Sequence, residues 1–406
     1  MKTITITYII MFFFGIYFLL LFLLLHFKNW NKLYDYPPSK RFPTITFLVP
    51  AYNEEKSIGN TIKSLLNLTY PKDKKKIIII NDGSKDKTAE IIRGFVKKYK
   101  NIKFLDKKNS GKADSLNQAL KLVNTELFAV TDADSYPEKE ALIKMVGFFE
   151  QDEKIAAVTS RVLVKNKNNF IEKYQDLDYN VIAWTRKLLD YVDSVYVTNG
   201  PLSIYNTKAA KKLGGFDPKN MTEDIEITWH LLSKGYQTKM SYSAKVYTTV
   251  PSRIKQWINQ RVRWNLGGLQ TIYKYKKYAL RENIFGYFVI TYVTFSFILA
   301  LIGIILLARF FWLKFSNYLF LSPYLLQGYN PLLFFKIDFY FTILIIFGLS
   351  FLALSIVYYK LALRDSEKRG IFGILIYAFV YRPLYTIPLL MSIYKLIKGE
   401  FGWYTK

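Results

Sequence analysis

Long apolar stretches lie near both ends of the chain, and mixed apolar and polar segments fill its middle. Tyr8–Phe27 is apolar over enough residues to cross a bilayer, and it lacks the small-residue cleavage site of a signal peptide, so we expect a permanent anchor. Three later apolar stretches lie at Phe285–Leu313, Ile337–Leu363 and Ile371–Ile397. Arg382 and Pro383 interrupt the last one and should face protein or water, because an ionisable residue and a helix breaker are costly in lipid. The pattern predicts a membrane protein with a water-facing domain between its anchors.

The middle of the chain predicts strands that alternate with helices. Helical patterns cover Ser57–Leu66 and Thr88–Lys98, and a third ends near Val123. The short apolar runs that alternate with them are Thr44–Val49, Lys76–Ile80, Ile102–Leu105 and Leu127–Val130. This alternation argues for an α/β fold with a doubly wound, largely parallel sheet. A further strand is expected at Ala156–Arg161 and a long helix at Phe170–Tyr191.

Charged side chains follow each of these first four strands. A carboxylate suits ribose hydroxyls, and a lysine together with a cation suits a diphosphate, so the set indicates a nucleotide diphosphate. Taken singly, each residue could equally be a surface or capping residue. The Gly-x-Gly-x-x-Gly and P-loop motifs are both missing, so metal and side chains must hold the phosphates. Because the carboxyl ends of parallel strands share one edge, we expect a single crevice lined by Glu54, Asp82, Lys112, Asp132 and Asp134.

Asp132 and Asp134 form the candidate metal site. Residues i and i+2 of an extended chain lie on one face, so both carboxylates can reach one cation. The chain has two histidines and no cysteine, which nearly excludes a zinc site of soft ligands. Oxygen ligands favour Mg²⁺ or Mn²⁺, and such ions commonly bridge carboxylates to substrate phosphates. The alternative is that both residues cap a loop.

The second half of the predicted domain offers two further candidates. Gly200 and Pro201 break a strand pattern and leave a loop that could approach a ligand closely. Thr222 is a plausible N-cap, with Glu223 and Asp224 in the first turn of the helix that follows. The helix dipole favours acidic residues there, so Asp224 is either a dipole-stabilised residue or a proton acceptor.

An amphipathic helix over Gln256–Leu269 precedes the second apolar stretch. Gln260, Arg263 and Trp264 lie at i, i+3 and i+4 and therefore share one face. The face could be an interfacial anchor with Arg and Trp at headgroup level. It could also place Arg263 on a phosphate and Trp264 at the mouth of a sugar site, and the two roles are compatible.

The formal net charge of +26 and the lack of cysteine bear on partners and location. A basic surplus suits nucleic acid, anionic lipid or phosphorylated substrates. No clustered basic face with a nucleic-acid-binding motif is recognisable, so no nucleic-acid partner is expected. The charge instead favours a domain held against an anionic cytoplasmic leaflet, and the absence of disulfides suits that compartment.

Taken in order, the motifs resemble those of the membrane-embedded family 2 glycosyltransferases. The likeness covers about Thr44 to Leu269, and it is closest to the processive branch of poly-N-acetylglucosamine, hyaluronan and chitin synthases. The strings that carry it are Pro50-Ala51-Tyr52-Asn53-Glu54-Glu55, Asn81-Asp82-Gly83-Ser84, Gly111-Lys112-Ala113, Asp132-Ala133-Asp134, Gly200-Pro201-Leu202, Thr222-Glu223-Asp224 and Gln260-Arg261-Val262-Arg263-Trp264.

The resemblance implies a GT-A fold and a role for each motif. Asp224, together with Glu223, would supply the catalytic base, and Asp134 with Asp132 would hold Mg²⁺ or Mn²⁺. Gly200, Pro201 and Trp264 would contact the acceptor. The nucleotide-sugar donor would be bound by Ala51, Tyr52, Glu54, Asp82, Lys112, Asp132, Gln260, Arg263 and Trp264.

The resemblance also implies a domain plan. Residues 1–35 would form the anchor, 36–250 the GT-A domain, 251–283 amphipathic interface helices and 284–406 the C-terminal membrane helices. The whole would be a multi-pass cell-membrane protein with its catalytic domain in the cytoplasm.

Three functions follow from these expectations. The first is an inverting, metal-dependent enzyme that uses a UDP-sugar to extend a β-linked polysaccharide and could also translocate it across the membrane. The second is transfer of a single sugar to a lipid phosphate carrier. The third, a basic membrane scaffold without catalysis, requires the acidic strand-end residues to be incidental.

Overall fold

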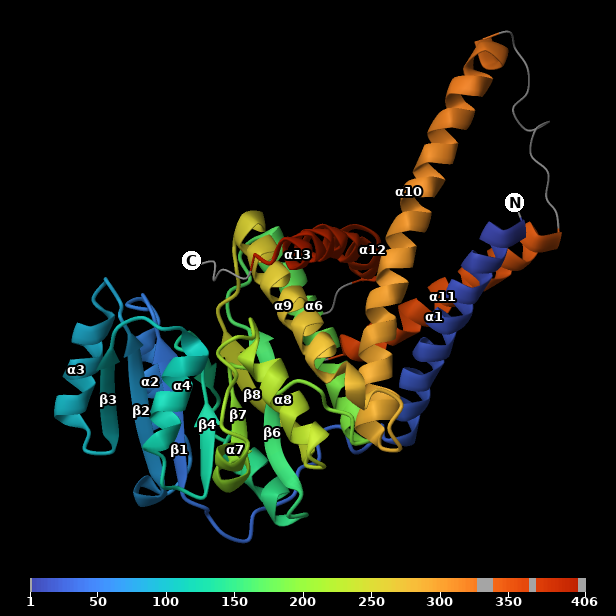
Figure 1. Ribbon diagram of the computed structural model, residues 1–406. Helices are drawn as coiled ribbons and strands as arrows, with labels where there is room; N and C mark the ends of the chain where they lie inside the picture. The colour runs from blue at the N-terminus through green and yellow to red at the C-terminus, as the bar shows by residue number, and fades with distance from the viewer. Residues whose placement is uncertain (1, 327–338, 365–369, 401–406) are drawn as a thin grey trace.

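A mixed eight-stranded sheet forms the centre of the molecule. The computed structural model describes residues 2–326, 339–364 and 370–400. The strands are β1 (Ile45–Ala51), β2 (Lys75–Asp82), β3 (Ile102–Lys107), β4 (Leu127–Val130), β5 (Ser135–Pro137), β6 (Ile155–Val164), β7 (Ser203–Asn206) and β8 (Gln237–Thr248). Their order across the sheet is β3-β2-β1-β4-β7-β6-β8-β5 (Figure 1).

The first half of the sheet is the doubly wound, parallel arrangement that the sequence predicts. β1 pairs in parallel with β2 on one side and with β4 on the other, and β2 pairs in parallel with β3. The chain therefore reverses direction across the sheet between β1 and β4, where ligands bind in open α/β sheets. The predicted strand near residues 156–161 is confirmed as β6.

The second half adds antiparallel pairs that the sequence did not indicate. β7 runs antiparallel to β4, and Ser203 lies opposite Val130 at the carboxyl end of β4. The loop that enters β7 therefore borders the loop that leaves β4. β8 is long but rich in lysine, serine and threonine, so its apolar pattern is weak, and it is buried because β6 and β5 flank it.

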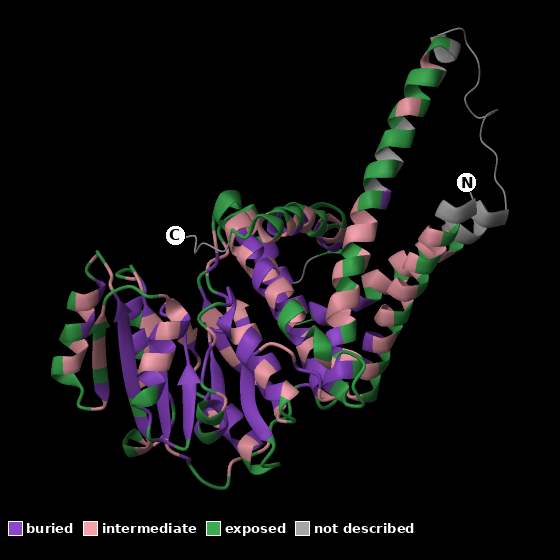
Figure 2. Ribbon diagram, viewed as in Figure 1, coloured by how far each residue is buried: buried purple, intermediate pink, exposed green. Residues whose placement is uncertain are grey.

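Helices cover both faces of the sheet. α2 (Ile58–Leu66), α3 (Thr88–Lys98) and α5 (Ile143–Val146) pack with Phe47 and Val49 of β1. α4 (Lys112–Lys121), α7 (Thr207–Lys212) and α8 (Glu223–Ser233) pack with Leu48, on the opposite face. Alternate residues of a strand point to opposite faces, so one apolar run supplies both cores. The inner strands are correspondingly buried, whereas the edge strand β3 is partly exposed (Figure 2).

Two long helices connect this domain to the apolar segments. They are α6 (Phe170–Asp190), which begins at a capping box formed by Asn169 and Glu172, and α9 (Ile254–Tyr275). The fully buried Trp184 of α6 and Trp257 of α9 share an aromatic core with Tyr381 from the C-terminal segment. The sheet domain and the apolar helices are therefore joined by a packed core.

Three helical segments of the described chain are long and apolar enough to cross a membrane: Ile6–Lys28, Phe285–Leu306 and Ile371–Lys398. The first belongs to α1 (Lys2–Lys28) and the second to a π-helical turn, Phe285–Ile290, and α10 (Thr291–Leu326). α10 projects away from the domain and exposes Ile305, Trp312 and Phe320, as expected for a lipid-facing surface (Figure 2).

α11 (Phe339–Ala362) lies alongside α1, with the rings of Phe12 and Phe351 5.8 Å apart (Figure 1). It corresponds to the expected stretch Ile337–Leu363, whose first two residues lie outside the described chain.

The last apolar stretch is bent. It consists of α12 (Ile371–Ile376), a π-helical turn (Tyr377–Tyr381), a 3₁₀ turn (Arg382–Tyr385) and α13 (Thr386–Lys398). Pro383 cannot donate a backbone hydrogen bond, which accounts for the break in the regular helix. α13 packs against α9 and runs in a different direction from α1 and α10 (Figure 1). The Arg382 side chain is partly exposed, and its guanidinium forms an ion pair with the buried Asp178 of α6 at 3.3 Å.

Candidate active site

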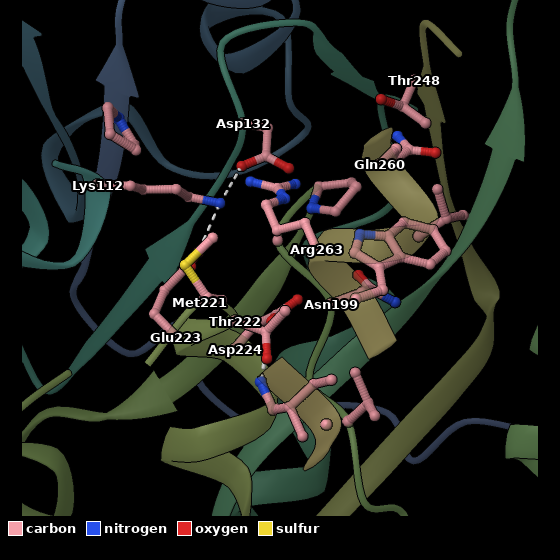
Figure 3. Close-up of a pocket in the computed structure, with 18 of the residues that line it drawn as sticks. Lys112, Asp132, Asn199, Met221, Thr222, Glu223, Asp224, Thr248, Gln260 and Arg263 are labelled. Carbon is pink, nitrogen blue, oxygen red and sulfur yellow. Dashed lines mark hydrogen bonds and ion pairs between the residues drawn. The ribbon is translucent and has the colours of Figure 1, made fainter. Parts of the chain in front are cut away.

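A cavity of about 920 Å³ lies at the carboxyl edge of the parallel strands. The loops after β1, β2, β3 and β4 form one side, and α6, α8, α9 and the start of α10 form the other. Every candidate donor, acceptor, metal and catalytic residue of the sequence analysis lines this cavity. Figure 3 labels several of them, among them Lys112, Asp132 and Asp224. The sheet topology brings them together, because the strands that precede these residues end at a common edge.

The loop after β1 forms the outer part of the cavity with Ala51, Tyr52 and Glu54. Asn53 has a left-handed backbone conformation, with φ 55°, and joins this loop to the loop after β2 by hydrogen bonds. Its backbone N–H donates to Ser84 Oγ at 2.9 Å, and its side-chain oxygen accepts from the backbone N–H of Lys85 at 2.9 Å. The first two strand ends are thereby held in a fixed relation.

Asp82 organises the loop that leads into α4. The side chain is buried, and its carboxylate accepts hydrogen bonds from Lys107 Nζ at 2.5 Å and from the backbone N–H groups of Ser110 and Gly111, both at 2.9 Å. A carboxylate with three such donors holds the loop in one conformation. Because Ser110 and Gly111 are held in this way, the position of Lys112, the next residue along the chain, is also defined.

Lys112 lies between two carboxylates. Its Nζ is 2.6 Å from Asp132 and 2.7 Å from Glu223, at the start of α8. Burial alone would lower the pKa of Lys112, but the charges of Asp132, Glu223 and Asp224 outweigh burial and raise it, so the ammonium stays charged. Gly200 closes over this pair, since a Cβ there would stand 2.7 Å from Asp132 Oδ2 and 3.0 Å from Lys112 Nζ. Gly200 therefore borders the charged end of the cavity.

The chemistry of Asp132 and Asp134 fits a divalent cation. Both carboxylates line the cavity, and Asp134 Oδ1 lies 3.4 Å from the hydroxyls of Ser135 and Thr248. Among the described residues, no group of three or more acidic or histidine side chains is arranged so that it could hold a metal ion. Two carboxylates leave the remaining positions of an octahedral ion to water and substrate phosphate, as is usual for Mg²⁺.

Asp224 differs from its neighbour Glu223. Glu223 is buried and ion-paired with Lys112, whereas Asp224 is only partly buried and lines the cavity (Figure 3). Burial, reinforced by the negative charge of Glu223, raises the pKa of Asp224 to about 6. An aspartate with this pKa is ionised at neutral pH and is more basic than usual, as a proton acceptor requires. Thr222 occupies the N-cap position, but its side chain makes no capping hydrogen bond.

The face of α9 predicted from the sequence does line the cavity. Gln260, Arg263 and Trp264 all line it, and Figure 3 shows Gln260 and Arg263 among the lining side chains. α9 passes close over the start of α8, because a Cβ on Gly267 would stand 2.1 Å from Thr222 Oγ1. Only glycine permits this approach of α9 to the start of α8, and the charge of Arg263 acts on Asp224 there.

Arg261, the second residue of the same motif, has a structural position instead. Its guanidinium is 1% exposed, forms an ion pair with the fully buried Asp178 at 3.1 Å, and stacks 4.0 Å from the centre of the Trp264 ring. Asp178 also accepts hydrogen bonds from Tyr377 and Tyr385 and pairs with Arg382. Asp178 therefore ties α9 to the C-terminal segment.

Asn199 is a cavity residue that the sequence analysis did not identify. It is 7% exposed, and its Nδ2 donates to the carbonyl of Ser160 at 3.0 Å, which fixes the orientation of the amide. Its Oδ1 and Gln260 Oε1 are both buried without a hydrogen-bond partner in the described chain. Buried acceptors are normally paired, so both fit hydrogen-bond donors of a ligand, such as sugar hydroxyls. The only signal for Asn199 in the sequence was its position directly before the Gly200-Pro201 motif.

The chain belongs to glycosyltransferase family 2: residues 43–267 match the family model described as "Glycosyltransferase like family 2". The poly-beta-1,6-N-acetyl-D-glucosamine synthase of Staphylococcus epidermidis is 35% identical over 230 residues, which are 56% of this chain and 55% of the synthase. The synthase of Staphylococcus aureus is 34% identical over the same shares. The chain thus spans about half the length of the curated relatives it matches.

A solved structure extends the likeness to the whole chain. The mannosyltransferase PcManGT from Pyrobaculum calidifontis, determined in complex with GDP-Man and Mn²⁺, has a TM-score of 0.62 at 19% identity. The similarity covers 98% of this chain and 99% of PcManGT. At this identity it shows the fold, and the GT-A fold expected from the sequence is confirmed.

Proposed function

We propose that the protein is an inverting, metal-dependent glycosyltransferase that uses a UDP-sugar to extend a β-linked polysaccharide. The observation that carries the proposal is one cavity that combines Lys112 and the Asp132–Asp134 pair with Asp224, whose pKa is about 6. Cations and a metal site suit a diphosphate leaving group, and a basic carboxylate beside them suits activation of a hydroxyl. The similarity to poly-N-acetylglucosamine synthases supports a polysaccharide as the product.

The donor is held at the strand ends. Glu54 and Asp82, with Ala51 and Tyr52, contact the nucleoside, while Lys112 and Arg263 bind the diphosphate. Asp134 and Asp132 would hold Mg²⁺ or Mn²⁺, which stabilises negative charge on the leaving diphosphate when bound. The partnerless oxygens of Gln260 and Asn199 accept hydrogen bonds from sugar hydroxyls. Each group thus has a partner on the donor.

The acceptor lies between Gly200, Pro201 and Trp264. Its hydroxyl oxygen attacks the anomeric carbon while the bond from that carbon to the diphosphate breaks on the opposite face. Asp224 takes the hydroxyl proton, and Glu223 keeps Lys112 in position. One displacement inverts the anomeric centre, so an α-linked donor gives a β-linked product. By analogy with glycosidases, the sugar has oxocarbenium character in the transition state.

We place the protein in the cell membrane as a multi-pass protein, with the GT-A domain in the cytoplasm. The exposed apolar side chains of α10 and the net charge of +26 support this placement. The domain plan is residues 1–35, 36–250, 251–283 and 284–406, as the motifs indicate. A cytoplasmic site gives access to nucleotide-sugars, and the polymer would cross the membrane beside the apolar helices.

Single transfer to a lipid phosphate is the second candidate. It is favoured by the contribution of α10, a candidate membrane span, to the cavity wall through Tyr292, Val293, Ser296 and Phe297. An acceptor embedded in the bilayer could reach the site along this wall.

A donor panel separates the candidates. The detergent-solubilised protein is incubated with radiolabelled UDP- and GDP-sugars in Mg²⁺ or Mn²⁺, and the products are sized. A polymer formed from one UDP-sugar supports the proposal. A product that carries one sugar on a lipid supports the second candidate, and the absence of both transfer and nucleotide release contradicts both.

A further inference from the structure

The last helix of the described chain, α13, has one buried and one exposed face. It packs against α9, and its buried residues are Pro388, Leu389 and Ser392. The residues on the opposite face are large, apolar and exposed, and they recur at i, i+3, i+4, i+7 and i+10, the spacing of one helix face. They are Ile387, Leu390, Met391, Tyr394 and Ile397. A continuous apolar face of this kind marks contact with lipid or with another protein.

The dimensions of α13 do not suit a membrane span. The segment Ile371–Lys398 is apolar enough to cross a membrane, but it is less apolar than Ile6–Lys28 and Phe285–Leu306. Pro383 divides this segment, and α13 itself has 13 residues. At a rise of about 1.5 Å per residue, α13 is about 20 Å long, whereas a hydrocarbon core is about 30 Å thick. α13 is therefore too short to cross alone, and it runs in a different direction from α1 and α10 (Figure 1).

The segment that contains α13 lies at the boundary between the sheet domain and the apolar helices. Trp257 Nε1 of α9 donates to the Tyr381 hydroxyl at 2.9 Å, and the Trp257 ring is 5.2 Å from the ring of Tyr385. The π-helical turn after α12 meets the end of α11, where the rings of Tyr359 and Tyr377 are 5.2 Å apart. One end of this segment is thus attached to α11, and α13 is attached to a helix that lines the cavity.

Basic side chains lie at the same boundary. Lys28 and Lys360 are in the last turns of α1 and α11, and Lys395 and Lys398 are in the last turn of α13. Both α1 and α11 end beside Trp184 of α6, a helix of the sheet domain. Lysines gather at this level on the side of a membrane where the leaflet is anionic. The charges therefore complement a lipid surface on the side of the GT-A domain.

We propose that α13 lies in the plane of the bilayer surface, on the same side as the GT-A domain, and does not cross the membrane. Its exposed face contacts the upper part of the acyl chains, and Lys395 and Lys398 contact anionic headgroups. Because α13 packs against α9, which carries Arg263 and Trp264, the lipid surface holds this cavity-lining helix at a fixed height. A spanning segment would instead place Lys398 on the far side of the membrane.

The depth of α13 in the bilayer is the first test. The chain has no cysteine, so each introduced cysteine carries a single fluorescent label. Leu390→Cys and Ile397→Cys are both exposed positions, and the labelled proteins are reconstituted in vesicles of phosphatidylcholine and phosphatidylglycerol. Spin-labelled lipids that quench near the headgroup or near the chain end report the depth. We expect both labels at an equal depth of about 5–10 Å, whereas a helix along the membrane normal would separate them by about 10 Å.

Two exposed positions serve as controls for depth. Ile298→Cys lies in the middle of the candidate span Phe285–Leu306, so its label should be quenched most strongly by the deep lipid. Lys97→Cys lies on α3 of the sheet domain, so neither lipid should quench its label.

The side of the membrane reached by the end of α13 is the second test. Glu400→Cys follows α13 directly, and Lys97→Cys reports the side of the GT-A domain. Both variants are treated with a membrane-impermeant maleimide in sealed vesicles of known orientation. The proposal predicts that both cysteines react from the same side.

Three results would overturn the proposal. Reaction of Glu400→Cys and Lys97→Cys from opposite sides, or depths at positions 390 and 397 that differ by about 10 Å, would show that α13 spans the membrane. Labels at both positions that neither lipid quenches would show that a second copy of the chain or another protein covers this face. If the lipids also fail to quench the Ile298→Cys label, the placement of the protein in a membrane itself fails. Neither measurement requires glycosyl transfer, so the proposed enzymatic function is tested separately.

Discussion

Asp224 shows how a local sequence pattern and a buried environment give opposite indications. Its place in the first turn of α8 predicts an aspartate that is stabilised as an anion. In the folded protein, burial and the adjacent Glu223 outweigh that effect, and the pKa rises to about 6. The position therefore combines ionisation at neutral pH with the basicity that proton abstraction needs.

The raised pKa of Asp224 predicts an acid limb in the pH profile. Only the ionised form accepts a proton, so kcat/KM should fall to half near pH 6 and then about tenfold per pH unit below it. An aspartate with an ordinary pKa near 3.8 would keep its activity to about pH 4. The measurement is kcat/KM for polymer formation between pH 4.5 and 8, and full activity at pH 4.5 would contradict the assignment.

Asn199 predicts a separate effect at the sugar. Asn199→Ala removes the fixed Oδ1 acceptor, so transfer should fall about tenfold to a hundredfold, the range expected for one lost hydrogen bond to a substrate. Affinity for the nucleoside diphosphate should stay within about twofold, because the residue does not contact that part of the donor. Isothermal titration with UDP measures the affinity, and a transfer assay measures the rate. A parallel loss of UDP affinity would place Asn199 at the nucleotide instead.

At the scale of elements, α9 connects the site to the membrane segment. Arg263 and Trp264 line the cavity, while Arg261, which stacks on the ring of Trp264, pairs with Asp178 of α6. Asp178 also forms an ion pair with Arg382 of the bent C-terminal segment. The Gln-Arg-Val-Arg-Trp motif thus combines residues that line the cavity with one, Arg261, that joins α9 to α6.

This network predicts a graded response to substitution. Asp178→Asn leaves the buried Arg261 without a carboxylate, at a cost of about 3–5 kcal/mol in the free energy of unfolding. Arg382→Gln should cost below about 1 kcal/mol, because the Arg382 side chain is 43% exposed and Arg261 keeps its partner. Thermal unfolding in detergent measures the loss of stability in each of the two variants. The donor KM should rise only for Asp178→Asn, and equal effects of the two variants would exclude Asp178 as the connection between α9 and the C-terminal segment.

At the scale of the whole molecule, the sequence predicts the part of the fold that is local. The four parallel strands are apolar runs separated by helices, so their parallel arrangement and their common edge follow from the chain itself. β7 and β8 could not be predicted in the same way. β7 has four residues, and the burial of the polar β8 arises from neighbours that are distant in sequence.

The same distinction holds for the site. Residues in motifs at strand ends, such as Lys112 and Asp132, could be placed in one crevice from the sequence. Asn199 and the buried Arg261 could not, because their roles depend on which groups lack or gain partners once β6, α6 and α9 pack together. Local pattern therefore locates the donor site, and tertiary contacts define the acceptor side.

The central claim is that Asp224 accepts the proton of an acceptor hydroxyl in this cavity. The most direct test is polymer formation by Asp224→Asn compared with the wild type, with the Kd for UDP measured on both proteins. The account predicts that the rate falls by about a thousandfold, within the range for loss of a general base, while the Kd for UDP changes by less than about twofold. A variant that retains more than about a tenth of the wild-type rate would show that Asp224 is not the base.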